Sequence, residues 1–260
     1  MYASKFTYNG HSSEEFGIMI GSIDNNDSFS GGEVEVKNVQ SPGKDEFDYF
    51  TETFPNVLVW NFTVIKYNCD NINDRYLTVD EERHIIKWLM GNEGYHDLVF
   101  NDGEHEDIHY MVYFNVTPCQ IAGRTVGYNL TATSNCGYGF TKEYVLTDIL
   151  NSSHPIQIQI NNDLKRKVMP YIIINSNGST KFTISNNNQT NIPLTITSKF
   201  SDVSGEIVMD SKNDIITNIP PSGFNYEFLY FIDGMNTIST DSDNDINVTI
   251  KYRENRRVIV

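Results

Sequence analysis

The chain has 260 residues and carries 34 acidic against 19 basic residues, which gives a formal net charge of −15. A protein this acidic is not expected to bind nucleic acid by neutralising phosphates, nor to attach to an anionic membrane surface. No apolar run approaches the roughly 18–20 residues of a membrane-spanning helix, and the N-terminus lacks the pattern of a secretory signal. The length and a hydrophobic fraction of 39% allow one large β domain or two ordinary domains.

The negative charge is concentrated in the first half of the chain. Residues 1–145 hold 9 Lys and Arg against 22 Asp and Glu, a balance of −13, whereas residues 146–260 hold 10 against 12, a balance of −2. This asymmetry favours two domains that meet different surroundings.

The first predicted element is FTYNGHSSEEFGIMI, from Phe6 to Ile20. Asn9-Gly10 is a strong turn signal, because both residues tolerate the positive φ of a tight hairpin. A lone hairpin is marginal in water, so this stretch must pack against another part of the protein.

The stretch PGKDEFDYFTETF, from Pro42 to Phe54, mixes acids with Phe47, Tyr49 and Phe50. Its pattern is too irregular to predict a regular strand, which suggests a loop. Aromatic residues on a loop are often contact anchors, although such a loop can also fold back over its own core.

One helix is predicted over TVDEERHIIKWLMG, from Thr78 to Gly91. Thr78 and Glu81 form a capping box, acids follow at the positive end of the helix dipole, and Gly91 is a natural stop. The helix is expected to cover a sheet with the apolar residues Ile85, Ile86 and Leu89 and with the packing anchor Trp88.

Most of the remaining chain reads as β-strands separated by turn signals, with alternation clearest in Val57–Tyr67, Ile108–Val116 and Thr125–Ser134. The pattern breaks between Gly139 and His154 and then resumes, so we expect two domains, residues 1–145 and 146–260. The short strands of the second domain predict a sandwich.

Two motifs suggest metal sites but fit them poorly. His105 to His109 reads H-E-x-x-H, yet it follows a turn signal and runs into a strand, where the two histidines lie roughly 13 Å apart at about 3.3 Å per residue. The run Asp241–Asp245 lacks the glycine and the distal glutamate of a calcium loop, so we interpret it as an acidic hairpin tip. We assign no catalytic, cofactor-binding or metal-binding residue. Cys69, Cys119 and Cys136 are interpreted as small buried thiols of a reducing compartment.

In order and spacing, these elements resemble the distal tail proteins, or Dit family, of long-tailed non-contractile bacteriophages. The resemblance rests on FTYNGHSSEEFGIMI, on the capped helix followed by YHDLVFNDGEHEDIHYMVYF, on the strand into TSNCGYGF, and on the closing stretch Phe228–Arg257. It implies a mainly-β protein, with an N-terminal β domain that carries one packed α-helix and forms a ring-shaped hub, followed by a galectin-like β-sandwich. It also implies a structural virion protein of the phage tail tip that is assembled in the host cytoplasm, has no cofactor and is not an enzyme.

The resemblance further implies a homo-hexameric ring that joins the tail tube protein to tail-tip proteins, while the second domain holds receptor-binding or other baseplate proteins. The opening hairpin would then be a strand edge where subunits meet. The candidate interface residues are Phe6, Tyr8, Phe16, Ile18, Phe47, Tyr49 and Phe50.

Six acidic first domains around a channel would repel phosphates, so DNA would pass through without being bound specifically. The alternative is that the charge faces outward and keeps the protein soluble.

Two other functions stay open. The second domain could be a carbohydrate-binding or host-surface-binding module, but Trp60 and Trp88 both precede the domain boundary, so Tyr or Phe would have to stack on the sugar. An enzyme of the tail tip, such as a wall hydrolase or metalloprotease, is the other alternative.

Overall fold

A computed structural model of the chain describes residues 4–21, 28–30, 35–40, 47–53, 56–67, 75–101, 103, 106–176, 182–189, 193–196 and 206–258. The protein is mainly β, as the sequence predicts. It divides into two compact units, Met1–Phe140 with Arg257–Val260, and Thr141–Arg256. The division precedes the expected boundary after Val145, because Tyr144 already begins a strand of the second unit.

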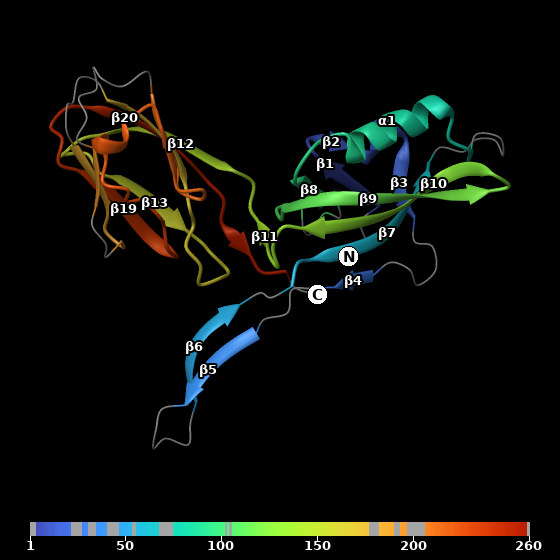
Figure 1. Cartoon of the computed structure of the whole chain (residues 1–260), viewed down its shortest axis with the longest axis horizontal. Helices are drawn as coiled ribbons and strands as arrows, with labels where there is room; N and C mark the ends of the chain where they lie inside the picture. Colours follow the sequence, from blue (N-terminus) through green and yellow to red (C-terminus); the bar gives the residue numbers. More distant parts are fainter. Residues whose placement is uncertain are drawn as a thin grey trace. The chain divides into compact units, whose positions relative to one another are not determined.

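The first unit is built on one antiparallel sheet of eight strands, in the order β2-β1-β8-β9-β10-β7-β3, with β4 also paired to β7 (Figure 1). The strands of this sheet are β1 (Lys5–Tyr8), β2 (His11–Ser12), β3 (Ile18–Gly21), β4 (Ser28–Ser30), β7 (Val59–Lys66), β8 (His96–Asn101), β9 (Tyr110–Ile121) and β10 (Arg124–Ser134). The first unit also contains β5 (Glu35–Gln40), β6 (Phe47–Thr53) and β11 (Gly139–Phe140), which lie outside this sheet. Its helices are the 3-10 turn η1 (Ser13–Phe16) and α1 (Val79–Met90).

The opening stretch forms the predicted hairpin and then returns to the sheet. Asn9 and Gly10 have φ values of 49° and 79°, and they join β1 to β2. After η1, the N–H of Ile20 donates to the carbonyl of Ser4 at 2.9 Å, which ties β3 to the residue before β1. Since β8 pairs with the other edge of β1, this strand lies within the sheet and not at a free edge. The hairpin as a whole nevertheless lies at an edge of the sheet, because β2 is the outermost strand in the order. Its place in a contact between subunits stays a prediction.

Helix α1 begins and ends as predicted. Thr78 caps it, and both hydrogen bonds of the capping box with Glu81 are present. Its buried face consists of Ile85, Trp88 and Leu89. Ile86 was expected to face the core but is 37% exposed, because the buried residues Ile85, Trp88 and Leu89 share one face at i, i+3 and i+4, and Ile86 is turned about 100° away from it.

The aromatic stretch before β7 is a strand and not the loop that its sequence suggested. Residues Phe47–Thr53 form β6, which pairs antiparallel with β5 in a separate two-stranded sheet. Val36 on β5 is 47% exposed. An isolated pair of strands is marginal in water, so this hairpin is a part of the first unit that other contacts would stabilise.

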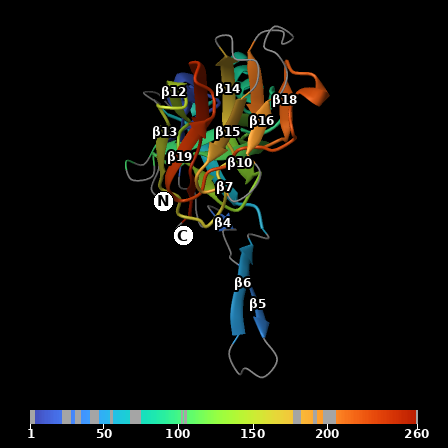
Figure 2. The same cartoon turned by 90° about the vertical axis from the view of Figure 1, so that its left-hand side faces the viewer.

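The second unit is the expected two-layer sandwich (Figure 2). One sheet has the order β12-β20-β14-β17-β18 and the other has the order β13-β19-β15-β16. Their strands are β12 (Tyr144–Leu150), β13 (Ile156–Ile160), β14 (Tyr171–Ser176), β15 (Phe182–Asn186), β16 (Leu194–Ile196), β17 (Ile207–Asp210), β18 (Ile215–Thr217), β19 (Gly234–Thr240) and β20 (Ile246–Tyr252), followed by β21 (Asn255–Arg256). The 3-10 turn η4 (Pro221–Gly223) lies between β18 and β19.

Both sheets of the sandwich contribute to one core. Ile156, Ile158 and Ile160 are buried and alternate with exposed glutamines along β13. Ile172 and Ile250, from the other sheet, belong to the same buried cluster. The period of two in the sequence thus reports one buried face per strand.

Candidate interaction surface

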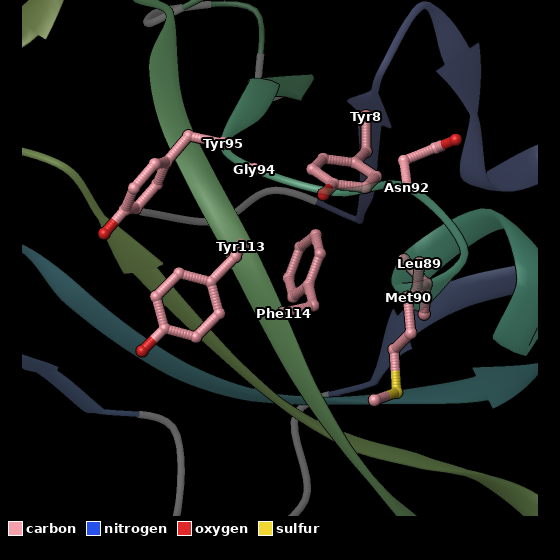
Figure 3. Close-up of a pocket in the computed structure, with 8 residues that line it drawn as sticks. All are labelled: Tyr8, Leu89, Met90, Asn92, Gly94, Tyr95, Tyr113 and Phe114. Atoms are coloured by element: carbon pink, nitrogen blue, oxygen red, sulfur yellow. The ribbon is translucent and has the colours of Figure 1, made fainter.

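An open hollow with a volume of about 340 Å³ lies on the first unit, where α1 ends and the chain turns into β8 (Figure 3). It is lined by aromatic and aliphatic side chains with one amide and one glycine, namely Tyr8, Leu89, Met90, Asn92, Gly94, Tyr95, Tyr113 and Phe114. This volume is at the lower end of ligand pockets, which span roughly 300–1,000 Å³. Such a hollow suits one or two side chains of a partner protein.

The rim of the hollow exposes three large side chains. Met90 at the end of α1 is 51% exposed, Tyr95 after it is 43% exposed, and Tyr113 on β9 is 39% exposed. The rings of Tyr95 and Tyr113 meet edge to face, with centroids 5.5 Å apart (Figure 3). Exposed tyrosine and methionine side chains beside a buried aromatic floor are typical of protein interfaces.

The floor of the hollow is part of the hydrophobic core of the first unit. Tyr8 and Phe114 are buried and pack edge to face, with centroids 4.8 Å apart. The indole N–H of Trp88 donates to the carbonyl oxygen of Tyr8 at 2.9 Å. Burial raises the pKa of Tyr8 to about 12, so its phenol stays neutral at any physiological pH. The opening strand therefore supports this surface from below.

The predicted ring-interface residues of the opening stretch are mostly inside the protein. Phe6, Tyr8 and Ile18 are 0%, 2% and 0% exposed. Phe16 is half-buried and stacks on Trp88, with ring centroids 4.2 Å apart. Their side chains already pack in the core of their own chain, and Tyr8 also lines the hollow. The role of these residues in a ring interface stays a prediction.

The other three predicted interface residues are Phe47, Tyr49 and Phe50, which lie on β6. Their backbone is described, whereas their side chains lie outside the described part of the structure. Their role in an interface stays a prediction.

The two metal-like motifs have other partners. His105 lies outside the described residues, and His109 places Nδ1 2.9 Å from both carboxylate oxygens of Asp97. In the acidic run, Asp243 accepts a hydrogen bond from the Ser152 hydroxyl, and Asp245 accepts one from the Asn151 amide. Among the described residues, no three His, Cys, Asp or Glu side chains are grouped as metal ligands would be.

The thiols are less buried than expected. Cys119 and Cys136 are free and half-buried, and partial burial raises the pKa of Cys119. Cys69 lies outside the described residues.

Sequence reasoning missed the rim residues, although one signal was available. Val112 and Phe114 are buried on β9, so the period of two places Tyr113 on the opposite face. A tyrosine at that position is a candidate contact residue. The contact between the Tyr113 and Tyr95 rings depends on the path of the chain after α1, which cannot be predicted from the local sequence pattern.

The chain matches one protein family and shares its fold with a solved structure. Residues 1–136 match the family described as phage tail protein N-terminal domain. The fold is similar to the crystal structure of the Dit (gp 19.1) protein of phage SPP1, with a TM-score of 0.59 and 11% identity, over 96% of this chain and 98% of that chain. That protein is described as a paradigm of the hub adsorption apparatus in phages that infect Gram-positive hosts. No curated protein matches the sequence. In the described part of the chain, no helix is both long and apolar enough to cross a membrane.

Proposed function

The chain belongs to the phage tail proteins that carry this N-terminal domain, and we propose that it is the hexameric hub that joins the tail tube to the adsorption proteins at the tail tip. The observation that carries the proposal is the family match over residues 1–136, which covers nearly the whole first unit. The fold shared with the SPP1 Dit protein supports the same role, and the family supports a structural part in place of an enzymatic one.

A ring of identical subunits needs a head-to-tail interface, which joins two different surfaces of the same chain. The hollow at the end of α1 is one exposed apolar surface of the first unit that can serve in such a contact. This hollow lies on the first unit, which is the domain that the family model matches.

The proposed channel is acidic. Residues 1–145 carry a balance of −13, and the described first unit exposes several of these carboxylates, namely those of Glu14, Glu15, Glu35, Asp80, Glu93, Glu106 and Asp107. A wall with this charge would repel DNA phosphates during passage and would leave no basic patch to hold them.

We further propose that the second unit holds receptor-binding or other baseplate proteins. Its five-stranded sheet exposes aliphatic side chains on β12 and β18, where Val145, Ile149 and Ile215 are 58%, 44% and 51% exposed. The low net charge of this half suits protein contacts.

The test of the hub is the oligomeric state of the purified protein in increasing salt. Like charges on neighbouring subunits repel each other, and salt screens them beyond a Debye length of about 10 Å at 0.1 M. We expect rings with sixfold symmetry by negative-stain microscopy, and a sedimenting hexamer that strengthens with added salt. A strict monomer at every salt and protein concentration would contradict the proposal, as would assembly of complete tail tips in phage that lack this protein.

Glycan binding by the second unit is a second candidate function, because Tyr226 is 61% exposed and has a φ of 59°. A positive φ is a genuine outlier for a bulky residue, and its ring is held against Phe224 with centroids 4.3 Å apart. A fixed, exposed ring can stack on a sugar face. Binding of the protein to host cell walls should be lost in Tyr226→Ala but kept in Tyr171→Ala, a control at another partly exposed tyrosine. Equal binding by both variants would remove this candidate.

A further inference from the structure

We propose that the hollow at the end of α1 receives the β9–β10 tip of the next copy of this chain, and that this contact closes the ring. The inference rests on the proposed hexamer and names the surfaces that meet in it. The tip is defined as Ile121, Ala122, Gly123 and Arg124.

The tip is narrow and presents one large apolar side chain. Ala122 and Gly123 form a two-residue turn with φ values of 51° and 77°. A positive φ at alanine is uncommon and is retained only where the surrounding structure requires it. Both turn residues are small, so the side chain of the neighbouring Ile121 projects from the tip and is 51% exposed. Arg124 lies directly across the hairpin from Ile121 in the strand register.

The hollow and the tip are complementary in shape and chemistry. The hollow is apolar and has room for a few side-chain groups, which fits an isoleucine better than a large ligand. Glu93 is exposed between the lining residues Asn92 and Gly94. The tip carries the exposed cation Arg124, which is oriented by contact with the ring of Tyr76 at 5.2 Å. In the proposed contact, the acidic Glu93 beside the hollow would therefore complement the basic Arg124 of the neighbouring tip.

The two surfaces lie toward opposite ends of one strand. Tyr113 is near the start of β9 and Ile121 is its last residue, so they are about 26 Å apart at roughly 3.3 Å per residue. In Figure 1 the β9–β10 turn lies at the right-hand end of the first unit, away from the connection between α1 and β8. A chain therefore cannot fill its own hollow. Two different surfaces at opposite ends form a heterologous contact, which closes into a ring when the rotation between neighbours allows it.

The decisive experiment uses two full-length variants that each lose one side of the contact. Ile121→Asp has no working tip, and Tyr113→Asp has no working hollow. Each alone should raise the concentration needed for rings at least about tenfold, as expected for a central interface residue. Mixed in equal amounts, they should form a 1:1 heterodimer and stop there, since only one functional contact remains. Met235→Asp, which changes a similarly exposed apolar residue of the second unit (48% exposed), should form wild-type rings.

A charge exchange tests the same contact without burying a carboxylate. Glu93→Lys and Arg124→Glu should each weaken the ring several-fold, and the double variant should recover most of the loss. Tryptophan fluorescence and circular dichroism check that every variant is folded. Wild-type rings in Ile121→Asp, or absence of the heterodimer from the mixture, would overturn this contact while leaving the hub intact. Failure of the wild-type protein to form rings under any condition would instead overturn the hub.

Discussion

Trp88 should be the residue on which the first unit depends most. It is 6% exposed, its ring stacks on Phe6 with centroids 5.5 Å apart and on Phe16 at 4.2 Å, and its indole N–H donates to Tyr8. It therefore fastens the opening strand and η1 to helix α1. Two variants separate its contributions. Trp88→Ala removes the ring and the hydrogen bond, whereas Trp88→Phe keeps an aromatic ring and removes the hydrogen bond.

The expected magnitudes follow from these contacts. Replacement of a buried tryptophan by alanine costs about 3–5 kcal/mol in cavity and lost transfer energy. The lost hydrogen bond adds about 1 kcal/mol, because the carbonyl of Tyr8 is left without its donor in a buried site. Trp88→Ala should thus remove much of a stability that is about 5–15 kcal/mol for a typical domain. Trp88→Phe should cost about 1–3 kcal/mol, from the hydrogen bond and the smaller ring.

Urea unfolding followed by tryptophan fluorescence measures this effect in the first unit alone, since both tryptophans of the chain lie in it. Trp60 remains as the reporter when Trp88 is replaced. The matched control is Met90→Ala, at an exposed position two residues further along the same helix. A loss of less than about 1 kcal/mol in the free energy of unfolding of Trp88→Ala, or a loss no larger than that of the control, would contradict this role of Trp88.

Further expectations concern the helix cap, two glycines and the junction between the units. Thr78→Ala should lower the stability of the first unit by about 1 kcal/mol in urea titrations, because it removes the N-cap side chain. Burial raises the pKa of Glu81, but hydrogen bonds from a lysine and from Thr78 outweigh it and leave the pKa below its ordinary 4.5. The lowered pKa means that the Glu81 carboxylate stabilises the folded protein above pH 4.5, and that this stabilisation is lost as the pH falls through the folded pKa. The destabilisation by Glu81→Gln should therefore shrink below pH 4.5. Gly127→Ala should lower the melting temperature more than Gly123→Ala, since a Cβ at Gly127 would lie 2.0 Å from a carbonyl oxygen of β7, whereas Gly123 loses only the ease of its positive φ. Brief trypsin digestion should cut after the exposed Lys142 and leave two folded fragments, and a single protected core across this junction would contradict independent units.

The features that the sequence predicted well depend on neighbouring residues. Thr78 and Glu81 cap a helix because three residues of chain place one side chain over the backbone of the other. Asn9-Gly10 makes its hairpin because both residues accept a positive φ. The alternation along β13 reports a sandwich strand with one buried face, whichever strand lies beside it. The resemblance to the Dit family is confirmed by the family match over residues 1–136 and by the fold shared with the SPP1 Dit protein at 11% identity.

The burial of the candidate interface residues in the opening stretch could not be predicted from sequence, for a physical reason. An aromatic residue in an opening hairpin can face a partner subunit or its own core, and the local pattern is the same in both cases. Phe6 is buried because its ring packs against Phe62, Trp88 and Phe114, which all lie far along the chain. The same holds for β6, whose strand form comes from its pairing with β5 and not from its irregular pattern.

By itself, the sequence determined the composition of the two halves, the helix and its ends, the turn of the first hairpin and the β class of both units. These depend on charge, on φ preferences and on side-chain period, which act over a few residues. Only the tertiary structure decided, for apolar residues outside these periodic patterns, which are core and which are surface. Tyr95 and Tyr113 meet at the rim of the hollow because a helix end and a strand from different parts of the chain are brought together there. Such contacts join segments far apart in the sequence, so their partners are known only once the sheet has formed.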